Sequence, residues 1–419
     1  MERRIGTVSR GLRAPIIKEG DDLRKIVVDT VMACHEGGDF TIRDRDVLAV
    51  TESILARAQK NFVTIDQMAQ DIRSKVGDET IGVVFPITSR NRFAICLQAI
   101  AQAAKKVVVM LSYPSDEVGN HLVDVEKVEE AGLNPFADLL TLEEFEKHFG
   151  PATHPFTNMN YPEYYTQLIN DEGAEAEIIF CNNPRRILEY TDNVICADIH
   201  TRFRTKKAVK AAGGKRVIGL DDIMTEPIDG SGYNPQYGIL GCNRSTDRMV
   251  KLFPINCQEF VEGVQADLKE KTGKTVEVMI YGDGAFKDPV GKIWELADPV
   301  VSPGYTAGLE GQPHELKLKY LADNEFADLK GAELQAAIEK KIREKEAGIE
   351  GQMGTTPRQL TDLLGITLGG DFSTMNPCIA GPARYIYIMA EDGNFPKYFG
   401  KVHAKFKSSA DFTVLRTGS

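Results

Sequence analysis

The strongest chemical signal in this sequence is an aspartate held between two glycines. Asp283 follows a predicted strand at residues 275–280, and glycine stands on either side of it. In α/β proteins, ligands bind just beyond the carboxyl ends of strands, and glycine lets the backbone approach an anion closely. Asp283 is therefore a candidate ligand for a divalent cation, and Lys287 and Lys292 are candidate phosphate contacts. The competing interpretation is a tight turn with solvated charges.

Two segments near the N-terminus carry weaker signals of the same kind. Glu52 and Ser53 follow an apolar run at residues 47–50, and Arg57 lies one helical turn later, so this segment is able either to grip a nucleotide or to cap a helix. Residues 14–17 contain a proline and lead into a predicted helix, with acidic residues at its positive end. On spacing alone, a capped helix start explains this second segment better.

Two polar loops complete the set of candidates. Residues 241–246 form a predicted polar turn after an apolar pair. Ser89, Arg90 and Arg92 precede a predicted helix at residues 93–104, and a helix N-terminus with arginines favours an anion. A capped helix with surface arginines is the alternative for this second loop.

Other motifs are better explained by structure. Residues 271–275 resemble the end of a phosphate-binding loop, but Leu268 stands where that motif needs a glycine, so Gly273 is expected to end a helix. Asp198 and His200 have the spacing of a metal-binding pair, yet a hydrogen-bonded structural histidine is the more common case. No serine-hydrolase elbow of the GxSxG type occurs in the sequence.

The elements that would position these residues indicate an α/β fold. Short apolar runs alternate with helical patterns, which is typical of a parallel sheet covered by helices. We expect strands at residues 47–50, 81–85, 107–110, 178–180, 194–196, 217–219 and 275–280. We interpret residues 77–225 as an inserted α/β domain within a core formed by residues 1–76 and 226–394. Residues 322–350 read as a charged surface helix, and residues 395–419 are a tail without a predicted structure.

Composition excludes several classes of protein. The net charge is −11, with no concentrated basic block, so nucleic acid is not an expected partner. The seven cysteines form no CxxC pair, which argues against a disulfide framework and a zinc ribbon and favours reduced thiols in the cytoplasm. No apolar run approaches 18 residues, so no membrane span is expected.

Taken in order, the candidate segments resemble the coenzyme F-420 gamma-glutamyl ligase family, over the first 60 or so residues and from about residue 238 to 299. The resemblance implies that the Pro-containing turn and the segment after the strand at residues 47–50 contact the nucleotide. It places metal ligands at Asp283 and Asn243, where asparagine replaces the family's aspartate. Gly284 replaces a threonine ligand, so one cation on Asp283 is the safer expectation. The implied nucleotide-binding residues are Ala14, Pro15, Ile16, Ile17, Glu52, Ser53, Arg57 and Thr246.

The same resemblance implies a homodimeric amide ligase that uses GTP or ATP with Mg²⁺ or Mn²⁺. It would add L-glutamate to a carboxylate-bearing small molecule, similar to the F-420 precursor, through an acyl phosphate. Arg57, Arg244 and Lys287 would neutralise phosphate charge, and Ser89, Arg90 and Arg92 would bind the acceptor. Two alternatives stay open: the same chemistry on another acceptor such as a folate, and a non-catalytic nucleotide-binding sensor. The family's C-terminal nucleotide loop has only a candidate match, at residues 369–371.

Overall fold

The computed structural model of the chain describes residues 8–90, 92–154, 158–282, 285–287, 294–296, 301–310 and 318–346. Within these residues the chain mixes helices and sheets, and the predicted α/β class is confirmed. Asp283, Gly284, Lys292, residues 347–350, residues 369–371 and the tail at 395–419 lie outside the described residues, and so does Asn91.

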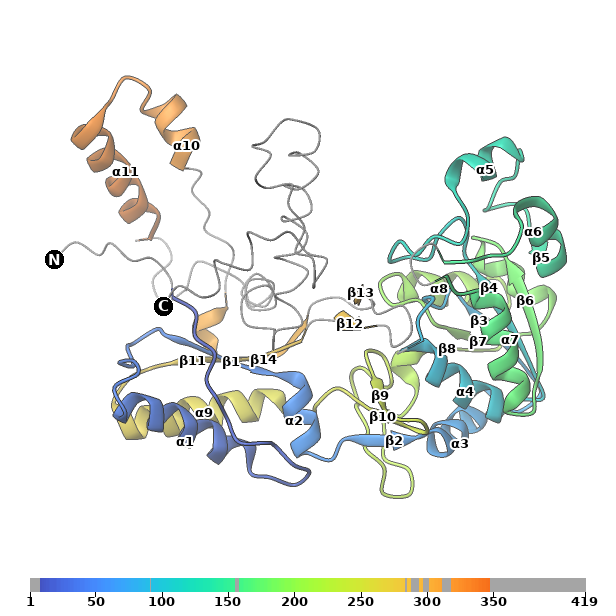
Figure 1. The fold of residues 1–419 in the computed structure, drawn as a ribbon, viewed down its shortest axis with the longest axis horizontal. Coiled ribbons are helices and arrows are strands. Elements are labelled where there is room, and N and C mark those ends of the chain that lie inside the picture. Colours follow the sequence, from blue (N-terminus) through green and yellow to red (C-terminus); the bar gives the residue numbers. More distant parts are fainter. Residues whose placement is uncertain are drawn as a thin grey trace, which may run out of the picture.

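The first sheet has three strands in the order β1 (Val47–Thr51), β11 (Glu277–Gly282) and β14 (Val301–Tyr305). β1 and β11 are parallel, and β14 is antiparallel to β11. Helices α1 (Leu23–Glu36) and α9 (Cys257–Thr272) lie together along one face of this sheet (Figure 1). Asp22 caps α1 by accepting a hydrogen bond from the Lys25 amide, as the acidic pair at its start predicts.

The alternation of side chains along β11 explains how this sheet is buried on both faces. Val278 and Ile280 join the core formed with α1 and α9, whereas Met279 and Tyr281 pack with Leu309 on the opposite face. Leu309 belongs to the short 3₁₀ helix η3 (Ala307–Leu309). The observed strand is shifted two residues toward the C-terminus relative to the predicted one.

The second sheet has six strands in the order β5-β6-β4-β3-β7-β8. Neighbouring strands are parallel except for β5, which is antiparallel to β6. Their bounds are β3 (Thr80–Val84), β4 (Lys106–Leu111), β5 (Leu140–Thr141), β6 (Glu175–Phe180), β7 (Asn193–Cys196) and β8 (Arg216–Gly219). The continuous apolar runs of β3 and β4 fit strands covered on both faces, so the predicted parallel layer is confirmed.

Helices cover both faces of the six-stranded sheet. One face packs against α3 (Ile65–Val76), α4 (Phe93–Ala103) and α7 (Tyr161–Asp171), and the other packs against α8 (Arg202–Ala211) and the 3₁₀ helix η1 (Pro184–Glu189). Because α3 precedes residue 77 and yet shares a core with α4, the packing does not change at that residue. The division of the chain into a core and an insert stays a prediction.

A small antiparallel sheet lies between the two larger ones (Figure 1). It has the order β2 (Phe62–Thr64), β10 (Met249–Lys251) and β9 (Asn243–Thr246). Val63 and Val250 belong to the same apolar core as α3 and α4. The predicted turn at residues 241–246 is therefore wrong for its last four residues, because residues 243–246 form a strand through pairing with β10.

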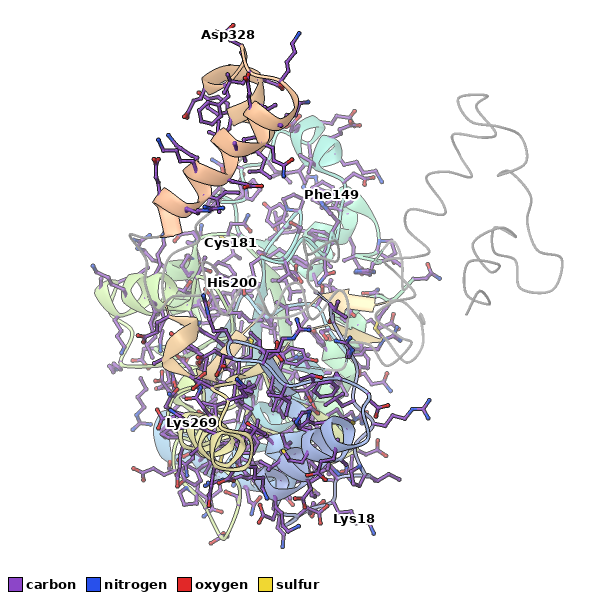
Figure 2. All side chains as sticks on the ribbon, turned by 90° about the vertical axis from the view of Figure 1, so that its left-hand side faces the viewer. Lys18, Phe149, Cys181, His200, Lys269 and Asp328 are labelled. Carbon is purple, nitrogen blue, oxygen red and sulfur yellow. The ribbon has the colours of Figure 1, made fainter. Side chains whose placement is uncertain are left out.

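The remaining elements are short or peripheral. They are α2 (Glu52–Ala58), α5 (Val125–Glu130), α6 (Leu142–Phe149), η2 (Leu220–Asp222), β12 (Ala285–Lys287), β13 (Trp294–Leu296), α10 (Leu318–Tyr320), the π-helical turn η4 (Leu321–Glu325) and α11 (Gly331–Glu346). The stretch predicted as one charged helix from residue 322 is broken by a turn before α11, with Asp328 at its tip (Figure 2). In the described part of the chain, no helix combines the length and apolar character needed to cross a bilayer.

Candidate nucleotide site

A polar cavity of about 190 Å³ lies where α2 meets the β9–β10 hairpin. It joins two parts of the chain that are far apart in sequence, and it includes four residues singled out from the sequence: Ser53, Arg57, Asn243 and Arg244. The other lining residues are Ile54, Phe62, Ser245 and Lys251. The pocket is therefore lined by three cationic side chains, two hydroxyls and one amide, a set of donors suited to an anion.

The α2 side of the cavity follows from how β1 ends. The chain passes from Thr51, the last residue of β1, directly into α2. Ser53 and Arg57 are four residues apart, so they share one face of the helix. Arg57 Nε donates a hydrogen bond to the Ile17 carbonyl oxygen over 2.9 Å, which holds the base of the guanidinium in place.

This hydrogen bond also brings the predicted Pro-containing segment to the rim of the site. Ile17 is buried in the first core, while Ala14, Pro15 and Ile16 are exposed. Ile16 is 86% exposed. None of residues 14–17 is among those that line the cavity, so the structure places the segment beside it.

The hairpin side of the cavity depends on strand register. Asn243 is paired with Lys251 across β9 and β10. Arg244 lies next to Asn243 and forms an ion pair of 3.0 Å with the exposed Asp247. Thr246 lies at the far end of β9, where its hydroxyl accepts a hydrogen bond from the Arg248 amide, and it is not among the lining residues.

Gly241 fixes the entry into β9. Its φ is +74°, and a Cβ at this position would lie 2.3 Å from the ring of Phe253. Both the left-handed conformation and the close approach therefore require glycine. This explains the glycine of the 241–246 motif without any ligand contact.

Lys251 is the principal residue of the site that the sequence reasoning missed. Its Nζ lies 3.3 and 3.2 Å from the two carboxylate oxygens of Glu52, and the side chains are only 8% and 11% exposed. Burial lowers the pKa of Lys251, while the facing Glu52 opposes that shift. Glu52 pairs with this lysine, and its predicted contact with the nucleotide stays a prediction. A lone cation within the apolar run of residues 249–253 is the signal that could have found it.

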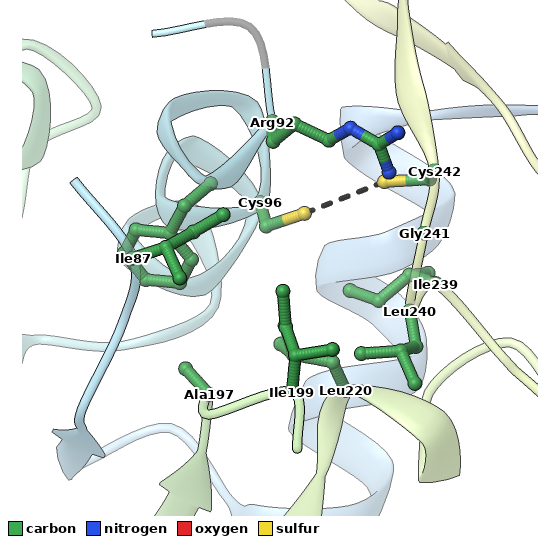
Figure 3. Close-up of a pocket in the computed structure, with 11 residues that line it drawn as sticks. Ile87, Arg92, Cys96, Ala197, Ile199, Leu220, Ile239, Leu240, Gly241 and Cys242 are labelled. Atoms are coloured by element: carbon green, nitrogen blue, oxygen red, sulfur yellow. Dashed lines mark hydrogen bonds between the residues drawn. The ribbon is translucent and has the colours of Figure 1, made fainter. Parts of the chain in front are cut away.

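A second, small cavity lies at the junction of the hairpin with the six-stranded sheet (Figure 3). Arg92, just before α4, extends toward Cys242, and the Sγ atoms of Cys96 and Cys242 are 3.6 Å apart. Most of the other lining residues are aliphatic. The hydrogen bond to Cys242 and burial raise the pKa of the Cys96 thiol. This narrow, largely apolar cavity lies where the two parts of the chain pack together.

The predicted acceptor residues are buried, which excludes the surface-arginine alternative. Ser89, Arg90 and Arg92 are 1%, 7% and 6% exposed. The Ser89 amide donates to the Tyr165 hydroxyl, which in turn donates to the Ile87 carbonyl oxygen. Burial of two arginines beside a helix start means that their charge is directed into the molecule. A role in binding the acceptor stays a prediction.

A divalent cation needs more oxygen ligands than the described residues around the cavity provide. Mg²⁺ and Mn²⁺ prefer several charged oxygens. The cavity offers only the Asn243 amide and two hydroxyls, and nowhere in the described ranges do three potential ligands of the His, Cys, Asp or Glu type cluster. These residues alone do not fit a hard cation. Asp283 lies outside the described residues. Lys287 is the last residue of β12, and the structure describes its backbone but not its side chain.

The two motifs set aside from the sequence are structural. Gly273 ends α9 in a left-handed conformation with φ +67°, as expected of a helix cap. The Asp198 carboxylate is fully buried and accepts hydrogen bonds from the hydroxyls of Thr201 and Thr205 at 2.5 and 2.6 Å. His200 is exposed, and within the described ranges neither residue belongs to a group of three or more potential metal ligands.

Comparison with known proteins gives one family. The family model described as F420-0:Gamma-glutamyl ligase matches residues 11–369. This span includes every residue that lines the polar cavity. No curated protein gives a significant match to the chain.

Proposed function

The chain belongs to the F420-0:gamma-glutamyl ligase family, and from that premise we propose that it joins L-glutamate to a carboxylate-bearing small molecule at the expense of GTP or ATP. Membership of this family makes it a ligase that forms amide bonds. The observation that supports nucleotide dependence is the polar cavity, in which Arg57 and Arg244 come from segments nearly 190 residues apart and line one space.

Amide formation from a carboxylate and an amine is unfavourable in water, so the reaction needs an activated acyl group. An oxygen of the acceptor carboxylate attacks the γ-phosphorus of GTP or ATP. The bond from that phosphorus to the β-phosphate oxygen breaks, and the nucleoside diphosphate leaves. The amine of glutamate then attacks the acyl carbon, inorganic phosphate leaves, and the amine loses a proton. Protein groups must position the reactants and neutralise charge, which suits Arg57 and Arg244.

The remaining roles are part of the same proposal. Ile16 would lie against the base, and Ser53 would donate to a phosphate oxygen. One Mg²⁺ or Mn²⁺ on Asp283 would add charge neutralisation when bound. The acceptor would reach Arg90 and Arg92, both buried beside α4. We further propose that the enzyme acts as a homodimer in the cytoplasm.

The proposal is tested with purified protein, labelled glutamate, GTP or ATP, and an F-420 precursor or a folate as acceptor. We expect label to enter one acceptor, with one diphosphate formed per amide bond. Arg57→Gln should lower this turnover at least tenfold, because a charge-assisted contact to phosphate is lost. Arg43→Gln, an exposed arginine outside the cavity, is the matched control. Nucleotide binding without diphosphate release in any mixture would favour the sensor alternative.

A further inference from the structure

A row of side chains crosses the small sheet and faces the polar cavity. Lys251 in the central strand β10 is paired with Phe62 on β2 and with Asn243 on β9. Directly opposed residues in a sheet project from the same face. All three residues line the cavity, so the side chains of Lys251 and Asn243 lie on the same face of the small sheet.

Glu52 contacts the Lys251 ammonium but does not occupy all of its hydrogen-bond donors. An ammonium has three hydrogen-bond donors, and a tight charged pair is usually about 2.7–2.9 Å long. Lys251 Nζ is 3.2 Å from one oxygen of Glu52 and 3.3 Å from the other. Lys251 therefore contacts the Glu52 carboxylate and also lines the cavity.

The Lys251–Glu52 pair also explains how a positive charge is kept in a buried position. A buried lysine without a counter-charge would be expelled or would lose its proton. Glu52 opposes the lowering of the Lys251 pKa that burial causes. An entering phosphate supplies a second anionic partner to the donors that Glu52 leaves unused. The other two cations, Arg57 and Arg244, are more exposed and approach from the rim.

We propose that Lys251 contacts the terminal phosphate of the bound nucleoside triphosphate. Its ammonium supplies positive charge beside that phosphate, whereas the neutral Asn243 cannot supply such charge by binding a metal ion. This inference rests on the proposed function. It assigns Lys251 as the residue that distinguishes a triphosphate from a diphosphate, and it makes Glu52 a positioning residue that acts through Lys251.

The test compares binding of GTP, GDP, ATP and ADP by calorimetry, with and without Mg²⁺. Because Lys251→Met alone would leave Glu52 buried without its partner, the main variant is the double substitution Glu52→Gln with Lys251→Met. The matched control removes the exposed pair Lys274–Asp44 through Lys274→Met with Asp44→Asn. Thermal unfolding confirms that each protein is folded.

We expect the main variant to lose affinity for the preferred triphosphate about tenfold or more, while affinity for its diphosphate changes less than about threefold. The control should keep the wild-type ratio. A folded main variant with an unchanged triphosphate-to-diphosphate ratio would show that the pair is only structural, and would leave the proposed function standing. If wild-type protein binds none of the four nucleotides, the proposed function fails first.

Discussion

Removing Lys251 alone should destabilise the protein more than removing the whole buried ion pair. At 3.2 Å, the attraction between Lys251 and Glu52 is about 5 kcal/mol for an effective dielectric constant of about 20. Both side chains are about nine-tenths buried, so each has lost most of its hydration. The lowered pKa of Lys251 indicates that this loss outweighs the attraction.

These opposing effects give definite expectations. Lys251→Met leaves an uncompensated buried carboxylate and should cost about 3–5 kcal/mol of unfolding free energy. The double variant with Glu52→Gln removes both charges and should return to within about 1 kcal/mol of wild type, or exceed it. Equilibrium urea unfolding followed by circular dichroism measures all four proteins of the cycle.

The exposed pair Lys274–Asp44 provides the control. Its atoms are closer, at 2.9 Å, but its side chains are 46% and 55% exposed. Lys274→Met should therefore cost much less than Lys251→Met, since water replaces the lost partner. Equal costs for the two lysines, or a double variant as unstable as Lys251→Met, would refute the argument that burial decides the energetics.

Three further predictions concern the elements around the site. Leu268→Ala should cost about 2–5 kcal/mol in urea unfolding, because Leu268 is fully buried on the inner face of α9, while Glu270→Ala on the exposed face should change little. Gly241→Ala should lower both stability and nucleotide affinity, since the new Cβ meets the Phe253 ring and displaces the start of β9; a normal nucleotide affinity would contradict this. Burial raises the pKa of Asp198 above its ordinary 3.8, so the folded state binds this proton more tightly than the unfolded state does. Its contribution to stability therefore falls as pH rises above about 3.8, and the stability of wild type relative to Asp198→Asn should decline from pH 4 to pH 7, which urea unfolding at each pH measures.

The sequence predicted best those elements whose signal is local. The apolar run of β4 and the glycine that ends α9 depend on neighbouring residues alone, so both were predicted within two residues. β9 depends on a partner strand instead. Its polar sequence at residues 243–246 resembles a turn until β10 is there to pair with it.

Helix α3 was missed although its start carries a local signal, the capping box of Thr64 and Gln67, and its buried apolar residues recur at helical spacing. The burial of its polar residues is what depends on distant contacts. It contains Asp71, which would favour a solvated face, yet this side chain is only 6% exposed. Its carboxylate accepts a hydrogen bond from the Met224 amide, 153 residues away, at 2.6 Å. A buried carboxylate of this kind cannot be recognised before its partner is placed.

In the candidate site too, residues with a local signal were predicted, and those that depend on a distant partner were not. Ser53, Arg57, Asn243 and Arg244 were found as members of separate motifs, and the structure brings them to one cavity. Lys251 was not found, because its role depends on a carboxylate 199 residues away in the chain. Arg90 and Arg92 were found, but their burial was not predicted, since it depends on packing of α4 beneath the six-stranded sheet.

A structure of the protein with a non-hydrolysable nucleoside triphosphate analogue tests the central claim most directly. We expect its phosphates in the polar cavity, within hydrogen-bonding distance of Arg57 and Arg244, with the terminal phosphate nearest Lys251. Phosphates bound at another place in the molecule, with this cavity holding only water, would contradict the account.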